Sequence, residues 1–394
     1  NPATADNYLG IPYMDHAETD LNPRYDRGTL KEVYEMIGKD IEEGIPLIDD
    51  TSYAVPKYHF NYKAACCFAS RYYLFIQDWD NAIKYATEAL TSNPTSLLRD
   101  YDAIAAIPNG TSRHQAYVQS SSSANFLVQA ATSSAGTVFG WYTTAGRYAH
   151  GKLQGTYETV QPKYGGPWGN SVYFKAGHAV LASSGKYILP RIWYTFQYTD
   201  PVAGTGYSKA VSVLFCMEEA LLNRAEAYVM KMQEDPSALD SALADMNMYA
   251  SNLFSSGFTP MTEESIKKWA TETYPNYSEL YVGKTSETSP QTLNPKKKLF
   301  APPYNALEKG GTQESMLQAL LFMRRYQFLH EGMRWFDTRR FGITVYRYTL
   351  DEDDETVLQI TDQISDEDGT PDPRRALQLP SDVIAAGLTP NPRN

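Results

Sequence analysis

Two amphipathic segments that adjoin in the sequence constrain the fold of this chain more than any other feature. Residues 68–94 read FASRYYLFIQDWDNAIKYATEALTSNP and hold two helical patterns, one on each side of the polar residues 77–80. Small alanines recur on the apolar stripe of the second pattern and let another helix approach closely, and Pro94 stops the run. The segment therefore predicts a pair of closely packed helices.

The second helix of this pair resembles the second half of a tetratricopeptide repeat, with a bulky residue before an Ala-Ile pair, an Ala-Leu pair and a closing proline. One such repeat cannot bury its apolar face alone, so other helices should stack on it. Helical spacing predicts further helices from Thr29, which forms a capping box with Glu32, within residues 211–254, and from Gln313 through Arg340. The predicted fold is mainly α: a tetratricopeptide-like helical repeat scaffold with long loop insertions and a few short strands.

The helical segments divide a chain whose 394 residues suffice for one large domain or two smaller ones. Loops as long as the stretches between the helical segments are usually functional or disordered, and the many aromatic residues of the first stretch disfavour disorder. We therefore predict that the first insertion is a ligand surface. The predicted parts are the helical pairs in 29–94, this aromatic-rich insertion in 108–210, a second helical pair in 211–254, a further insertion in 255–312, and a C-terminal helix within 313–394.

Composition excludes several classes of protein. The chain carries 35 Lys and Arg against 46 Asp and Glu, a net charge of -11, so we expect no nucleic-acid partner. No apolar run approaches the roughly 20 residues that span a bilayer. The three cysteines, Cys66, Cys67 and Cys216, lack the spacing of a zinc site or a disulfide framework and are expected to be buried apolar residues.

Tyrosine is unusually common, with 30 Tyr against 15 Phe and 6 Trp, and its flat apolar ring with a polar tip suits polar ligands. The sugar C–H groups of a glycan would pack on such rings, while Arg, Asn and Gln side chains bond its hydroxyls. A second aromatic set, Trp193 to Tyr198, alternates like a strand with one aromatic face, for which we favour a place in the core. The predicted ligand-binding set lies in the first insertion and comprises Trp141, Tyr142, Tyr148, Tyr164, Trp168, Arg147 and Asn170, with Gln154 nearby in sequence.

The stretch RRYQFLHEGMRWFDTRRFG, residues 324–342, mixes basic and aromatic side chains and could grip a phosphate, contact a sugar or hold the fold together. Its pattern resembles the C-terminal signature of the SusD/RagB family of outer-membrane nutrient-binding lipoproteins. KEVYEMIGKDIEEGIPLI, NRAEAYVM and DPRRALQLPSDVIAAGLTPNPRN agree with the same family in order and spacing. Departures at Met323, Gln327 and His330 bear on local salt bridging rather than on the fold. The residues that carry the signature are Arg324, Arg325, Glu331, Gly332, Arg334, Asp337 and Arg340.

The resemblance implies a single SusD-like domain over residues 1–394, an α/α superhelix. In it these signature residues act as a structural clamp, because Arg bridges carboxylates bidentately. It further implies a non-catalytic protein at the outer face of the outer membrane. That protein would capture an oligosaccharide or polysaccharide and deliver it to a SusC-like TonB-dependent transporter. Family members carry a signal peptide, a lipidated cysteine and further helices upstream, and we expect this N-terminal segment to be missing from the chain.

Several alternatives remain open at this stage. The same family role with peptide cargo is one, and an intracellular tetratricopeptide-type protein-interaction scaffold is another. The sequence holds no GxSxG, HExxH, P-loop or EF-hand motif, and a glycosidase-type carboxylate pair leaves no local signal among 46 acidic residues. We expect no cofactor; the acidic run Asp351–Glu355 offers oxygen ligands for calcium, but the alternating residues after it favour a hairpin tip.

Overall fold

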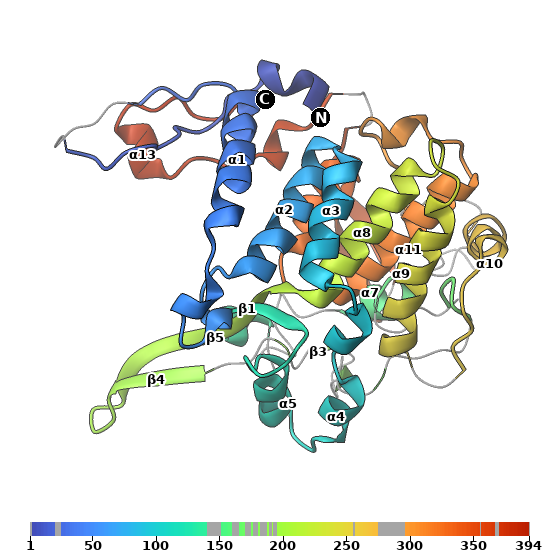
Figure 1. Ribbon diagram of the computed structural model, residues 1–394, viewed down its shortest axis with the longest axis horizontal. Helices are drawn as coiled ribbons and strands as arrows, with labels where there is room; N and C mark the ends of the chain where they lie inside the picture. Colours follow the sequence, from blue (N-terminus) through green and yellow to red (C-terminus); the bar gives the residue numbers. More distant parts are fainter. Residues whose placement is uncertain are drawn as a thin grey trace.

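A stack of helices forms the body of the protein in the computed structural model (Figure 1). The structure describes residues 2–19, 25–139, 151–159, 165–169, 175, 180–181, 187–188, 191, 195–254, 257–274, 296–354, 356–366 and 370–393. The α-helices are α1 (Leu30–Gly44), α2 (Tyr62–Ile76), α3 (Trp79–Leu90), α4 (Tyr101–Ala106), α5 (Gly110–Tyr117), α6 (Ala135–Phe139), α7 (Lys152–Tyr157), α8 (Met217–Lys231), α9 (Ala238–Leu253), α10 (Glu263–Lys268), α11 (Thr312–Gln327), α12 (Met333–Phe341) and α13 (Ser381–Ala385).

Successive helices of the stack pack on one another, α2 on α3, α3 on α8, and α8 on both α9 and α11 (Figure 1). Ala82, Ala86 and Ala89 of α3 are completely buried, so the small-residue stripe does bring a neighbouring helix close. Thr29 and Glu32 form the predicted capping box at the start of α1. The mainly α, repeat-like fold predicted from the sequence is confirmed.

Three antiparallel strands, in the order β1-β5-β4, form a sheet below the helical stack: β1 (Asn125–Thr132), β4 (Thr195–Asp200) and β5 (Thr205–Cys216). β2 (Val180–Leu181) and β3 (Tyr187–Ile188) pair separately. The β4–β5 hairpin projects from the body (Figure 1). The predicted strand is present, but its assignment to the core is wrong for Tyr198, which is 58% exposed on this hairpin. Trp193 and Tyr194 lie outside the described residues.

The helix predicted from Gln313 through Arg340 is in fact two helices, α11 and α12. Between them the backbone turns sharply, because His330 and Gly332 adopt left-handed conformations with φ of 64° and 81°. The continuous apolar spacing concealed this break. Its consequence is that Arg324 and Glu331 do not share one helical face, because Glu331 lies between the two helices.

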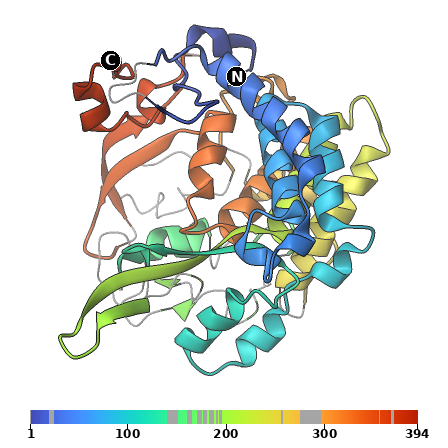
Figure 2. The same ribbon diagram turned by 60° about the vertical axis from the view of Figure 1, so that its left-hand side comes forward.

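A two-stranded hairpin, β6 (Val345–Leu350) and β7 (Val357–Ile364), follows α12 and stands apart from the helical stack (Figure 2). The described part of the acidic run, residues 351–354, forms its turn, so the predicted hairpin tip is confirmed. No group of three or more His, Cys, Asp or Glu side chains suited to a metal occurs among the described residues. The absence of a cofactor stays a prediction, with calcium at the acidic run as its alternative.

The three cysteines are free and buried, as expected from their apolar surroundings. Among the described helices, none combines the length and apolar character that a bilayer-spanning segment requires.

Candidate functional site

Arg324, Asp337, Arg340 and Glu226 form a buried ion clamp that ties α11, α12 and α8 together. Arg324 donates to Asp337 from Nε at 3.0 Å and to the side-chain oxygen of Asn223 at 2.7 Å. Arg340 donates to Asp337 at 2.9 Å and to Glu226 at 3.0 Å. Burial alone would raise the pKa of Asp337, but the adjacent arginines lower it below its ordinary value. This geometry supports the structural interpretation of these signature residues.

Glu331 makes a separate contact, with its carboxylate 3.1 Å from the guanidinium of Arg191. Burial raises the pKa of Glu331 to about 7, although Arg191 acts in the opposite direction.

Gly332 starts α12, as described above, and Gly342 ends it with φ of 66°. A Cβ at Gly342 would lie 2.8 Å from the amide nitrogen of Ala301, so the extended segment 296–301 can approach α12 only because this residue is glycine.

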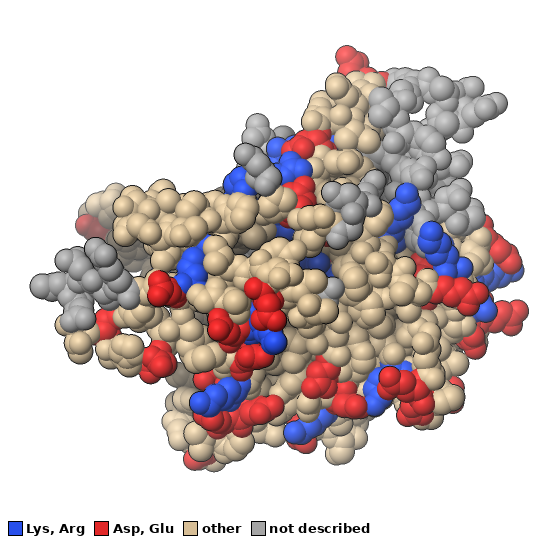
Figure 3. Space-filling model, turned by 90° about the horizontal axis from the view of Figure 1, so that it is seen from above, with Lys and Arg blue, Asp and Glu red and all other residues tan. Residues whose placement is uncertain are grey.

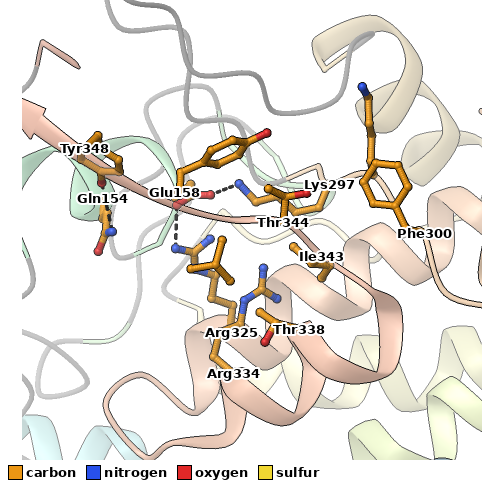
Figure 4. Close-up of a pocket in the computed structure, with 13 residues that line it drawn as sticks. Gln154, Glu158, Lys297, Phe300, Arg325, Arg334, Thr338, Ile343, Thr344 and Tyr348 are labelled. Atoms are coloured by element: carbon orange, nitrogen blue, oxygen red, sulfur yellow. Dashed lines mark hydrogen bonds and ion pairs between the residues drawn. The ribbon is translucent and has the colours of Figure 1, made fainter. Parts of the chain in front are cut away.

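The other side of α12 borders a pocket of about 150 Å³, which we call the cationic pocket (Figure 4). It lies between α7, the ends of α11 and α12, the extended segment and β6. Its lining residues are Gln154, Glu158, Lys297, Lys298, Phe300, Arg325, Arg334, Thr338, Ile343, Thr344, Val345, Tyr346 and Tyr348.

Local packing brings these segments together. Leu153 of α7 packs against Val357 of the hairpin, with Tyr348 and Leu350 alongside. The extended segment is held to α11 by Gln318, whose amide accepts from the backbone of Lys297 at 2.9 Å and donates back to it at 2.6 Å. The pocket walls therefore include the rigid helical core.

Glu158 is the electrostatic centre of the cationic pocket. Its carboxylate pairs with Lys297 Nζ and with Arg325 Nη2, the latter at 2.6 Å, and its side chain is only 3% exposed (Figure 4). Burial alone would raise the pKa of Glu158, but Arg325 and Lys297 together lower it to about 2. Burial lowers the pKa of Lys297 to about 8, with Glu158 opposing and Arg325 reinforcing the shift.

The pairing of Glu158 predicts how acid affects stability. Because the folded-state pKa lies below the ordinary value, Glu158 stabilises the fold above pH 4.5, and this contribution is lost as the pH falls toward 2. Glu158→Gln should lower the free energy of unfolding by about 2 kcal/mol at pH 7. Urea unfolding at pH 7, 5 and 3 should show the difference from wild type shrinking below pH 5. A difference that stayed constant with pH would contradict the assigned pairing.

Aromatic rings and hydrogen-bond donors share the pocket wall. Tyr346 and Tyr348 alternate along β6 and both line the cavity, as does Phe300. Gln154 donates to the hydroxyl of Tyr348 at 3.2 Å. Flat rings beside amide, guanidinium and ammonium groups provide stacking surface and donors at once, which is the combination that a sugar ring with hydroxyls requires.

Among the sequence-predicted ligand residues, Trp168 requires a correction. Its ring is 2% exposed and stacks on Phe254 and Phe322, with centroid distances of 4.2 and 5.2 Å. It belongs to the core and has no open face for a ligand. Gln154 does line the pocket. The other predicted ligand residues, Trp141, Tyr142, Arg147, Tyr148, Tyr164 and Asn170, lie outside the described residues.

Two signature residues also depart from the clamp interpretation. Arg325 and Arg334 line the cationic pocket rather than join the buried ion clamp. Sequence reasoning treated all seven signature residues alike. It also passed over the basic run Lys296–Lys298 and the alternation of Tyr346 and Tyr348, which are the sequence signals that point to this pocket.

Comparison with known proteins identifies the fold. Residues 4–74 match the model of a SusD-like family described as starch-binding and associating with the outer membrane. No curated protein matches the sequence. A solved structure of a Bacteroides vulgatus protein named for sugar binding is 18% identical and gives a TM-score of 0.55. The match covers 99% of this chain and 72% of that protein's chain.

Two further solved structures are similar across nearly the whole chain. A SusD superfamily protein of Bacteroides thetaiotaomicron is 16% identical, covers 100% of this chain and 73% of its own, and gives a TM-score of 0.54. A SusD-like carbohydrate binding protein of Bacteroides vulgatus is 13% identical and gives a TM-score of 0.52. The match covers 97% of this chain and 70% of that protein's chain. The identities are low, so these structures establish a shared fold. Together with the family match over residues 4–74, they show that this chain has the fold of SusD-like proteins.

Proposed function

We propose that this protein binds glycans without cleaving them, and that the cationic pocket is the binding site. The observation that carries the proposal is the meeting of three aromatic rings with amide, guanidinium and ammonium donors in one cavity. The names of two similar structures, one sugar-binding and one carbohydrate binding, support the same class of ligand. Its resemblance to SusD-like proteins supports the further proposal that the protein captures oligosaccharide at the outer face of the outer membrane, held there by a lipid anchor, and delivers it to a SusC-like TonB-dependent transporter.

The charge arrangement of the pocket favours binding over hydrolysis. A glycosidase uses two carboxyl groups, one of which has a raised pKa and donates a proton. Glu158 is the single carboxylate among the described lining residues, and the side chains of Arg325 and Lys297 lower its pKa to about 2. It is therefore ionised and occupied near neutral pH, and it cannot act as a general acid.

Tyr346→Ala tests the site. Loss of a ring that stacks on sugar should weaken binding by about 1–3 kcal/mol, as for other aromatic platforms. Isothermal titration calorimetry against a panel of neutral and acidic oligosaccharides measures the change, with reducing-end analysis of the same mixtures to detect cleavage. Tyr207→Ala is the matched control, because Tyr207 lies on β5 and is 57% exposed.

Equal affinity of the two variants would place the binding surface elsewhere. New reducing ends would overturn the non-catalytic assignment. Binding of peptides with silence on every glycan would replace the proposed cargo by peptide.

A further inference from the structure

The cationic pocket carries more positive charge than its own carboxylate balances. The described lining residues include a single carboxylate, that of Glu158, and four basic side chains, those of Lys297, Lys298, Arg325 and Arg334. Glu158 already pairs with Lys297 and Arg325. Arg334 and Lys298 are therefore left as the surplus.

This surplus is local. On the described part of the face drawn in Figure 3, acidic and basic side chains are interspersed rather than separated. The whole chain is acidic, with a net charge of -11. The excess of basic side chains in this cavity therefore contrasts with the mixed charge of that face and with the acidic chain as a whole.

Arg334 is the residue whose state most needs an explanation. Its Nη1 atom is buried and has no hydrogen-bond partner among the described residues. Burial and the adjacent guanidinium of Arg325 lower the pKa of Arg334 to about 10, while Asp337 and Glu158 act in the opposite direction. Both oxygens of Asp337 are already taken by the buried ion clamp.

A buried donor without a partner is costly, and a buried like-charge neighbour adds to the cost. Figure 4 shows Arg325 and Arg334 rising from α11 and α12 toward the same cavity. Such a strained arrangement is expected where a bound anion completes it.

We propose that the cationic pocket selects acidic oligosaccharides, with the carboxylate or sulfate of one sugar unit held by Arg334 and Lys298. This inference rests on the proposed glycan-binding function and adds the class of glycan. A guanidinium fork matches a carboxylate or sulfate bidentately. The rings of Tyr346 and Phe300 offer the remaining sugar face a stacking surface. A cavity of about 150 Å³ accommodates a six-membered ring.

Matched pairs of glycans test the proposal because they change charge and little else. The probes are tetragalacturonate, hyaluronan tetrasaccharide and a chondroitin sulfate tetrasaccharide, each beside its methyl-esterified or desulfated counterpart. Calorimetric titration of the wild type should give at least one acidic member bound about 10- to 100-fold more tightly than its counterpart, the range for a charge-assisted hydrogen bond. The preferred pair distinguishes a carboxylate from a sulfate.

Arg334→Gln should remove this preference, and Lys298→Gln should reduce it about 2- to 5-fold, as expected for an exposed charge pair. Lys298 is exposed, so its replacement leaves the fold intact and keeps the test valid if Arg334→Gln is poorly folded. Arg347→Gln is the control: it makes the same charge change on β6, beside the lining residue Tyr346, but Arg347 is exposed and does not line the pocket.

The outcomes separate this inference from the proposed function. Equal binding of the two members of every matched pair, or a preference that survives in Arg334→Gln, overturns acidic selection and leaves glycan binding in place. Silence on every glycan overturns both. Binding of acidic peptides in place of every glycan shows that the same cations serve a different cargo and also overturns the inference.

Discussion

Asp337→Ala is expected to lower the free energy of unfolding by about 3–5 kcal/mol, the usual result of removing one partner from a buried ion pair. Asp337 is fully buried and accepts from both Arg324 and Arg340. Without it, two guanidinium groups between α11 and α12 would lose a shared carboxylate. Chemical denaturation monitored by circular dichroism measures the loss.

Asp362→Ala is the control for Asp337→Ala. Asp362 also pairs with an arginine, Arg374, at 3.0 Å, but the side chains of Asp362 and Arg374 are 43% and 40% exposed. Such a surface pair contributes less than about 1 kcal/mol. If Asp337→Ala were as mild as this control while glycan affinity collapsed, Asp337 would belong to the binding site and the structural role of the buried ion clamp would be wrong.

Trp168→Ala is the second large effect, with an expected loss of about 3–5 kcal/mol for truncation of a buried tryptophan. The ring lies between Phe254 and Phe322, so its removal opens a cavity at the junction of α9 and α11. The midpoint of thermal unfolding should fall markedly. Tyr198→Ala, which truncates a ring that is 58% exposed, should leave the midpoint nearly unchanged.

A stable Trp168→Ala protein with weakened glycan binding would restore the sequence-based assignment of this residue to the ligand surface. Retained affinity in a destabilised variant would confirm its place in the core.

Local features were predicted well because local physics determines them. Ala82, Ala86 and Ala89 fix a close helix contact through their size, and Thr29 with Glu32 fixes a helix start through hydrogen bonds within four residues. The hairpin after α12 follows from alternation and a polar turn in the same way. These signals need no knowledge of distant segments.

Features that depend on distant segments were missed. An indole in a glycine-rich stretch reads the same whether it is exposed or buried; Phe254 and Phe322 decide that Trp168 is buried. Glu158 and Lys297 are 139 residues apart, and only the folded chain shows that they meet. The break at Gly332 was hidden because apolar spacing continued through it.

The signature stretch shows why spacing alone could not separate two roles. Arg334 and Asp337 lie one turn apart on α12, yet Asp337 joins the buried ion clamp and Arg334 faces the pocket. The sequence predicted that these residues belong together. It could not predict which of them form ion pairs with one another.

The shared helix α12 has a consequence for how relatives of this protein could diverge. Asp337 and Arg340 of the buried ion clamp and the pocket residue Arg334 lie within the nine residues of α12, so substitutions in this wall also affect the stability of the fold. The wall made by β6 and the exposed Lys298 contains no residue of the buried ion clamp. Relatives that bind a different glycan are therefore expected to differ in the sequence of the hairpin and its facing segment, and to keep the sequence of α12.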